Sequence, residues 1–148
     1  MSSNPQFIIR DAQQADIPEL SILLTQLGYP STPEEVQTRF DAWENHPDHR
    51  TLVITDGERL AGMSGVMKSL WVEKNGSYVR ILAFVIHEDY RGRKIGKQLL
   101  LAIDDWARQV GANTIIVASG NREERYPAHH FYQNNGFRNY ALGFVKNL

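Results

Sequence analysis

The chain contains no cysteine. This absence excludes disulfide bonds, thiolate nucleophiles and metal centres built on cysteine ligands. The chain also lacks an excess of positive charge, because 16 Lys and Arg face 17 Asp and Glu and leave a net charge of −1. Proteins that bind nucleic acid or anionic membranes through a basic surface normally show such an excess. We therefore expect neither nucleic acid nor a membrane among the partners.

Long hydrophobic runs are absent as well. No apolar segment approaches the roughly 20 residues that span a bilayer, and the opening MSSNPQFIIRD lacks the basic and apolar regions of a signal peptide. These features predict a cytoplasmic protein. The 148 residues are 42% hydrophobic and include neither a linker nor a repeat, which predicts a single domain over residues 1–148.

The first third of the chain carries strand and helix signals. The apolar run over residues 7–10 predicts a strand, and residues 16–19 (DIPE) combine an Asp cap, a first-turn Pro and a Glu, as helix starts do. Gly28 is placed to end that helix. Residues 32–35 (TPEE) repeat the start signal and predict a second helix.

The middle of the chain changes to the pattern of strands. Residues 51–55 and 60–72 are rich in β-branched and apolar residues, and Asp56-Gly57 and Asn75-Gly76 are hairpin-turn signals. Residues 78–87 (YVRILAFVIH) are apolar enough for a central strand.

Further along, the apolar spacing predicts a helix from Gly92 to about Gln109, with Gly111 as its stop. A strand over residues 113–119, a short helix over 127–135 and a final strand over 141–146 complete the pattern. The resulting order, β-α-α-β-β-β-α-β-α-β, predicts an α/β protein of the α+β kind with a mixed sheet.

One segment carries a chemical signal, namely Tyr90–Lys97 (YRGRKIGK), where a strand leads into a helix. The first amides of a helix have no internal acceptor, and the helix dipole adds positive potential there. Two glycines and four cations at that point suit a di- or triphosphate, although a solvated basic helix start fits the same residues. A nucleotide P-loop is excluded because Gln98 follows Gly96-Lys97, and the Rossmann glycine pattern is missing.

The run HEDYRGRKIGKQLL resembles motif A of the GNAT N-acetyltransferases, Gln/Arg-x-x-Gly-x-Gly/Ala. Arg91 matches its first position and Gly96 its last, whereas Lys94 stands where the motif has its middle glycine. A second family marker is a strand followed by Asn, a short helix with Phe-Tyr, and Gly-Phe. It matches Asn121, Phe131-Tyr132 and Gly136-Phe137 at the expected separation. The resemblance implies the GNAT fold.

The resemblance also implies a site for acetyl-CoA as co-substrate. In the family, one strand pairs with the pantetheine arm, a loop holds the pyrophosphate, an Asn bonds the pantetheine and a Tyr protonates the departing thiolate. The residues that match these roles are Phe84, Val85 and Ile86 for the strand, Arg91, Gly92, Arg93, Lys94, Ile95, Gly96 and Lys97 for the loop, Asn121, and Tyr132.

The general base is not evident from the sequence. Many family members place a Glu on the fourth or fifth strand, but Leu82 and Ala118 stand at those positions. His87, His129 or a water chain remain alternatives. His46 and His49 lack a third ligand at a suitable spacing, so we expect no metal and two solvated imidazoles there.

Together these features predict transfer of an acetyl group from acetyl-CoA to the primary amine of a small molecule, by direct attack with Tyr132 as general acid. A protein N-terminal or lysine acetyltransferase and a non-catalytic acyl-CoA-binding module are the alternatives. The acidic second helix (Glu34, Glu35, Asp41 and Glu44) would suit a polycationic acceptor or simply be solvated. Family habit adds a possible homodimer.

Overall fold

The computed structural model describes residues 6–119 and 125–148. The chain divides into two compact units, Met1–Ile116 and Val117–Leu148, and each is described by itself. That the two form one domain stays a prediction. No helix among the described residues is both long and apolar enough to cross a membrane.

The first unit is built on a sheet whose strands are neighbours in their order along the chain. The first four run antiparallel to one another. Their bounds are β1 (Ile8–Asp11), β2 (His49–Thr55), β3 (Leu60–Leu70), β4 (Ser77–Ile86) and β5 (Ala112–Val117). Gly57 and Gly76, at the two predicted hairpin turns, both have positive φ angles, 105° and 100°.

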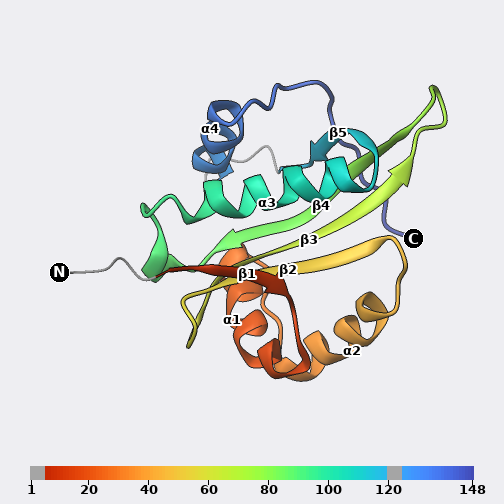
Figure 1. Cartoon of the computed structure of the whole chain (residues 1–148). Helices are drawn as coiled ribbons and strands as arrows, with labels where there is room; N and C mark the ends of the chain where they lie inside the picture. The colour runs from red at the N-terminus through yellow and green to blue at the C-terminus, as the bar shows by residue number, and fades with distance from the viewer. Residues whose placement is uncertain (1–5, 120–124) are drawn as a thin grey trace. The chain divides into compact units, whose positions relative to one another are not determined.

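Helices cover both faces of this sheet (Figure 1). On one face, α1 (Ile17–Leu27) packs on β3 and β4, and α2 (Pro33–Glu44) packs on β2. On the other face, α3 (Ile95–Gln109) packs on β2, β3 and β4. Short 3-10 turns, η1 (Gln14–Asp16) and η2 (Glu88–Tyr90), precede α1 and follow β4, and α4 (Tyr126–Asn134) belongs to the second unit.

The helix ends follow the signals in the sequence. Gly28 ends α1 with a left-handed φ of 112°. Thr32 and Glu35 form a capping box at the start of α2. The Glu35 amide donates to Thr32 Oγ1 at 3.2 Å, and the Thr32 amide donates to Glu35 Oε1 at 3.0 Å. The predicted start of α2 is therefore confirmed. Helix α1 begins at Ile17, directly after Asp16 as predicted, but the Asp16 side chain does not cap it and accepts instead from the Gln13 amide at 2.7 Å.

A β-bulge interrupts β4. Gly65 of β3 pairs with Ala83, whereas the next residue, Val66, pairs with Ile81, so Leu82 is the extra residue on β4. Bulges bend a strand and re-aim its side chains. The bulge therefore separates the first half of β4 from its last four residues.

The last four residues of β4 also extend past β5. Both strands begin at the same end, because Ser77 Oγ donates to the Gly111 carbonyl at 3.4 Å and Gly76 lies against Asn113. The six residues of β5 are too few to accompany all ten of β4. Residues 83–86 thus lie beyond the strand that pairs with the first part of β4.

The predicted strand over residues 141–146 is wrong, since the structure has no strand there. Leu142, Phe144 and Val145 are 79%, 93% and 90% exposed. Apolar composition alone does not make a strand, because a strand also needs a neighbour to accept its backbone hydrogen bonds. The helix predicted from Gly92 starts instead at Ile95. The mixed α+β fold class itself is confirmed.

Gly62 and Gly65 provide a matched test of the β3–β4 pairing. A Cβ on Gly62 would lie 2.7 Å from Ile86 Cδ1 and 2.8 Å from the Val85 carbonyl oxygen, whereas one on Gly65 would meet His49 Cε1 at an ordinary 3.7 Å. We expect Gly62→Ala to lower the unfolding free energy by about 1–3 kcal/mol. Urea denaturation should show a much smaller change for Gly65→Ala, and equal effects would contradict this close approach.

Candidate functional site

The start of α3 adopts a left-handed turn. Gly92 has φ 82°, and Lys94, the N-cap, has φ 61° and ψ 19°. Lys94 is the one non-glycine residue with positive φ among the described residues. A side chain in this conformation costs about 1–2 kcal/mol. The turn therefore keeps the backbone shape of a glycine although lysine occupies it.

The first amides of α3 are uncovered. The amides of Ile95, Gly96 and Lys97 donate to no other described residue, and the first hydrogen bond inside the helix runs from the Gln98 amide to the Lys94 carbonyl at 3.3 Å. The four cations of the turn (Arg91, Arg93, Lys94 and Lys97) are exposed and form no ion pair with a described Asp or Glu. Donors, dipole and positive charge thus combine here as they do in anion-binding sites.

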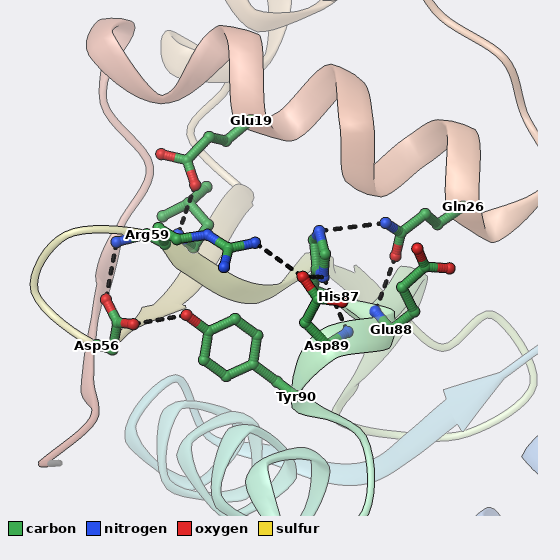
Figure 2. Close-up of polar contacts among 9 residues, drawn as sticks. Glu19, Gln26, Asp56, Arg59, His87, Glu88, Asp89 and Tyr90 are labelled. Atoms are coloured by element: carbon green, nitrogen blue, oxygen red, sulfur yellow. Dashed lines mark hydrogen bonds and ion pairs between the residues drawn. The ribbon is translucent and has the colours of Figure 1, made fainter.

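Tyr90 ties this turn to the sheet (Figure 2). Its buried hydroxyl donates to Asp56 Oδ2 at 2.5 Å, across to the β2–β3 turn. This hydrogen bond raises the pKa of Tyr90 and lowers that of Asp56. The guanidiniums of Arg59 and Arg93 lie 5.5 and 5.4 Å from the centre of the Tyr90 ring. Arg93 is thus held beside the turn.

His87 is occupied by structural contacts in the same network (Figure 2). Its Nδ1 accepts from the Asp89 amide at 3.0 Å, and its Nε2 lies 3.2 Å from Gln26 Nε2 on α1. Gln26 Oε1 in turn accepts from the Glu88 amide at 3.0 Å. The imidazole therefore caps η2 and joins it to α1, and we assign it no role as a base.

The end of β4 directs polar backbone groups away from β3. The His87 amide donates to the Ala61 carbonyl at 2.7 Å. Because hydrogen-bonded and non-bonded pairs alternate in an antiparallel ladder, the amides of Phe84 and Ile86 point away from β3. The Val85 side chain is buried in the core between the sheet and α1 and α2. The Phe84–Ile86 segment is therefore held by β3 and by the core, while two of its amides lie on the side of β4 away from β3.

A cavity of about 340 Å³ lies on the α1 and α2 face of the sheet. It extends to Leu82 and Ala83 of the bulge, directly before the Phe84–Ile86 segment. We call it the α-face cavity. Its lining includes Leu24, Tyr29, Arg39, Trp43, His49 and Leu82. Leu82, where the family often has a Glu, thus presents an apolar side chain to this cavity.

His49 differs from the expectation of a solvated imidazole. It is half-buried, its ring stacks on Trp43 at 5.7 Å and an interplanar angle of 12°, and its Nε2 lies 2.9 Å from Thr51 Oγ1. Burial, helped by the neighbouring His46, lowers the pKa of His49 below its ordinary value. His49 is therefore neutral at neutral pH. The strand alternation of His49, Thr51 and Val53 toward one face was the signal that could have identified it.

The acidic residues of α2 do not line the α-face cavity. Glu35 caps the helix, and Asp41 accepts a hydrogen bond from Gln37 at 2.8 Å. These contacts favour the solvated alternative over a site for a polycationic acceptor.

In the second unit, Tyr132 is buried on α4. The rings of Phe131 and Phe137 each lie 5.5 Å from its ring. Burial raises the pKa of Tyr132, an effect that Arg125 partly opposes. His129 is partly buried beside Tyr126, with ring centres 5.6 Å apart. Asn121, the predicted pantetheine ligand, lies outside the described residues.

The turn at the start of α3, the end of β4 and the α-face cavity are the candidate site of the first unit. The chain belongs to the acetyltransferase (GNAT) family, whose profile matches residues 17–137. This membership confirms the resemblance seen in the sequence, and it makes the class that of acetyl-CoA-dependent N-acetyltransferases.

Individual relatives agree with this assignment. A GNAT family acetyltransferase from Staphylococcus aureus is 32% identical, with a TM-score of 0.83 over 96% of this chain and 98% of that one. Glucosamine-6-phosphate N-acetyltransferase from Arabidopsis thaliana is 25% identical, with a TM-score of 0.78 over 96% and 98%. The aminoalkylphosphonate N-acetyltransferase of Salmonella typhimurium is 30% identical over 100 residues, which are 68% of this chain and 63% of that relative.

Two substitutions of Lys94 separate backbone shape from charge. Both Lys94→Gly and Lys94→Ala remove the ammonium group, but only glycine relieves the left-handed strain. We expect Lys94→Gly to exceed Lys94→Ala in unfolding free energy by about 1 kcal/mol. Urea denaturation of the two variants measures this difference. Equal stability would show that the turn is not strained.

Proposed function

We propose that this protein transfers the acetyl group of acetyl-CoA to the primary amine of a small molecule. The observation that carries the proposal is the start of α3, where three amides without an acceptor among the described residues and four exposed cations without a described carboxylate partner lie at a left-handed turn. Arg91, Gly92, Arg93, Lys94, Ile95, Gly96 and Lys97 would hold the diphosphate of acetyl-CoA there. Such an arrangement of backbone donors and positive charge suits a diphosphate.

The end of β4 would position the acyl group. Phe84, Val85 and Ile86 would pair with the pantetheine arm, and Asn121 would add a hydrogen bond to it. When bound, acetyl-CoA supplies the thioester that the amine attacks. A β4 amide aimed at the thioester oxygen would stabilise the negative charge that develops there.

Tyr132 would act as the general acid. Burial raises its pKa, so the phenol keeps its proton at neutral pH and can give it to the departing thiolate. In this scheme the new C–N bond forms, the C–S bond breaks, and the phenol is later reprotonated from solvent.

The acceptor is placed in the α-face cavity. Its volume of about 340 Å³ suits a small molecule. Two of the relatives are named for small amine substrates, an aminoalkylphosphonate and glucosamine-6-phosphate. A cytoplasmic location and a homodimer stay predictions from the sequence.

We expect Tyr132→Phe to bind acetyl-CoA and to lose turnover. At 100 times its dissociation constant, acetyl-CoA should raise the melting temperature of both proteins by roughly 5–10 °C. Thiol release with a panel of amines should fall by about 100-fold in the variant. Tyr126→Phe, in an exposed tyrosine of the same helix, is the control. No thermal shift would refute the proposal, and a shift without turnover of any amine would favour the acyl-CoA-binding module.

His49 is our candidate for the proton acceptor of this reaction. An amine with the pKa of lysine is neutral in only about one molecule in 2,500 at pH 7, so a base in the acceptor site would speed the reaction. Neutral His49 lines the α-face cavity together with Thr51, whose hydroxyl lies 2.9 Å from its Nε2. A proton released in the cavity can reach the imidazole directly or through this hydroxyl.

The pH profile tests this role. Because the pKa of His49 is lowered, the wild-type protein should lose activity only below about pH 6.5, where His49 becomes protonated. We expect His49→Gln to remove this acidic limb from kcat/KM and to lower kcat by about 100-fold. The limb due to the amine itself should remain. His46→Ala, in the exposed neighbour, should keep kcat and the acidic limb but move that limb to higher pH, because His46 helps to lower the pKa of His49. An unaltered profile in His49→Gln would exclude His49 as the base.

A further inference from the structure

The α-face cavity has one formal charge on its lining, and that charge is positive. Arg39 of α2 is its only Lys, Arg, Asp or Glu among the described residues. Leucine side chains and the ring of Trp43 form much of the rest. We propose that the acceptor is an amine that also carries an anionic group, and that Arg39 binds this group. This inference rests on the proposed function.

Arg39 is available to a ligand because no described carboxylate lies within ion-pair distance of it. Four other arginines of the first unit, Arg10, Arg50, Arg59 and Arg108, each pair with an aspartate. Arg39 forms no ion pair with a described residue. Glu35, one helical turn before Arg39, is engaged through Oε1 by the Thr32 amide at 3.0 Å. The guanidinium is therefore neutralised less than its counterparts.

Arg39 is also held in place. Its Nη1 donates to Ser31 Oγ at 2.8 Å, and Ser31 Oγ donates in turn to the Tyr29 carbonyl at 2.8 Å. Ser31 is buried, and its amide donates to Thr25 Oγ1 of α1 at 3.3 Å. These bonds occupy Nη1 and leave Nη2 and Nε for a ligand. Arg39 is exposed, and a guanidinium already restrained by one hydrogen bond loses less conformational entropy when it binds a carboxylate or phosphonate in a two-point contact.

The cavity orients such an acceptor. Arg39 and Trp43 line it from α2 and His49 from β2, whereas Leu82 and Ala83 line it from the bulge of β4, two strands away in the sheet and next to the Phe84–Ile86 segment. A molecule anchored by its anion on Arg39 would therefore direct its amine toward the bulge. A bare polyamine would find no carboxylate on the described lining to replace its water shell.

Matched acceptors test the proposal. With acetyl-CoA as donor, kcat/KM is measured for 2-aminoethylphosphonate and β-alanine, and for their neutral counterparts ethanolamine and β-alaninamide. We expect the wild-type protein to prefer the anionic member of at least one pair. Arg39→Ala should lower kcat/KM for that acceptor by about 10- to 100-fold, as loss of charge-assisted hydrogen bonds does. It should change the neutral counterpart by less than about 2-fold. The pair in which the anionic acceptor is preferred shows whether the anion is a carboxylate or a phosphonate.

Two controls separate this proposal from the proposed function. Arg108→Ala removes an exposed cation of α3 and should leave every ratio unchanged. Acetyl-CoA binding, followed by thermal shift, should be the same in Arg39→Ala and the wild-type protein. The proposal would be overturned if kcat/KM for the neutral amines equalled or exceeded that for the anionic ones. It would also be overturned if Arg39→Ala lowered kcat/KM equally for both members of a pair, and in either case the transferase function would stand. Failure to bind acetyl-CoA would overturn the function itself.

Discussion

The site depends on how β4 is paired along its length. Its first part lies between β3 and β5, whereas its last four residues keep β3 and pass the end of β5. The bulge at Leu82 marks the change. Since the α-face cavity reaches the bulge and Phe84–Ile86 follows it directly, one strand locates the proposed binding places of both substrates. The approach of Gly62 to the Val85 carbonyl shows how closely β3 holds this segment.

The turn before α3, where we propose that the diphosphate binds, is positioned by side-chain hydrogen bonds and not by strand pairing. Tyr90 and Asp56 join the turn after β4 to the β2–β3 hairpin, and His87 and Gln26 join it to α1. These contacts fix the backbone from which Gly92 and Lys94 enter their left-handed conformations. A lysine there carries two costs, its left-handed backbone and a positive charge at the positive end of the helix dipole, and a bound anion would offset both.

Local signals were sufficient where one segment determines its own structure. The caps at Thr32 and Gly28 and the hairpin turns at Gly57 and Gly76 were predictable, since each depends on a few adjacent residues. The strand predicted over residues 141–146 failed because strand formation depends on a distant partner, which composition does not reveal. The glycines and cations at the start of α3 predict a diphosphate site, and that role stays a prediction. The α-face cavity could not be predicted, because it combines side chains from α1, α2, β2, β3 and β4.

His49 shows the same limit at a single residue. In the sequence it follows Pro47 and His46 and has the surroundings of a loop, but in the structure it begins β2 and stacks on Trp43 of α2. Its burial comes from a neighbour on another element, and with burial comes the lowered pKa. The tertiary contact, and not the residue type, therefore changes a solvated imidazole into a neutral group inside a cavity.

Leu82 connects the missing glutamate with the proposed acceptor. A carboxylate at this position would border the same cavity as Arg39. In a partly apolar cavity, opposite charges interact more strongly than in bulk water, so such a carboxylate would compete with an anionic ligand for the guanidinium or repel that ligand. An uncharged leucine avoids both effects and leaves proton transfer to a neutral group. The proposed roles of Leu82, His49 and Arg39 thus agree with one another. An acceptor that Arg39 binds through its negative charge is better served by a neutral general base than by a carboxylate.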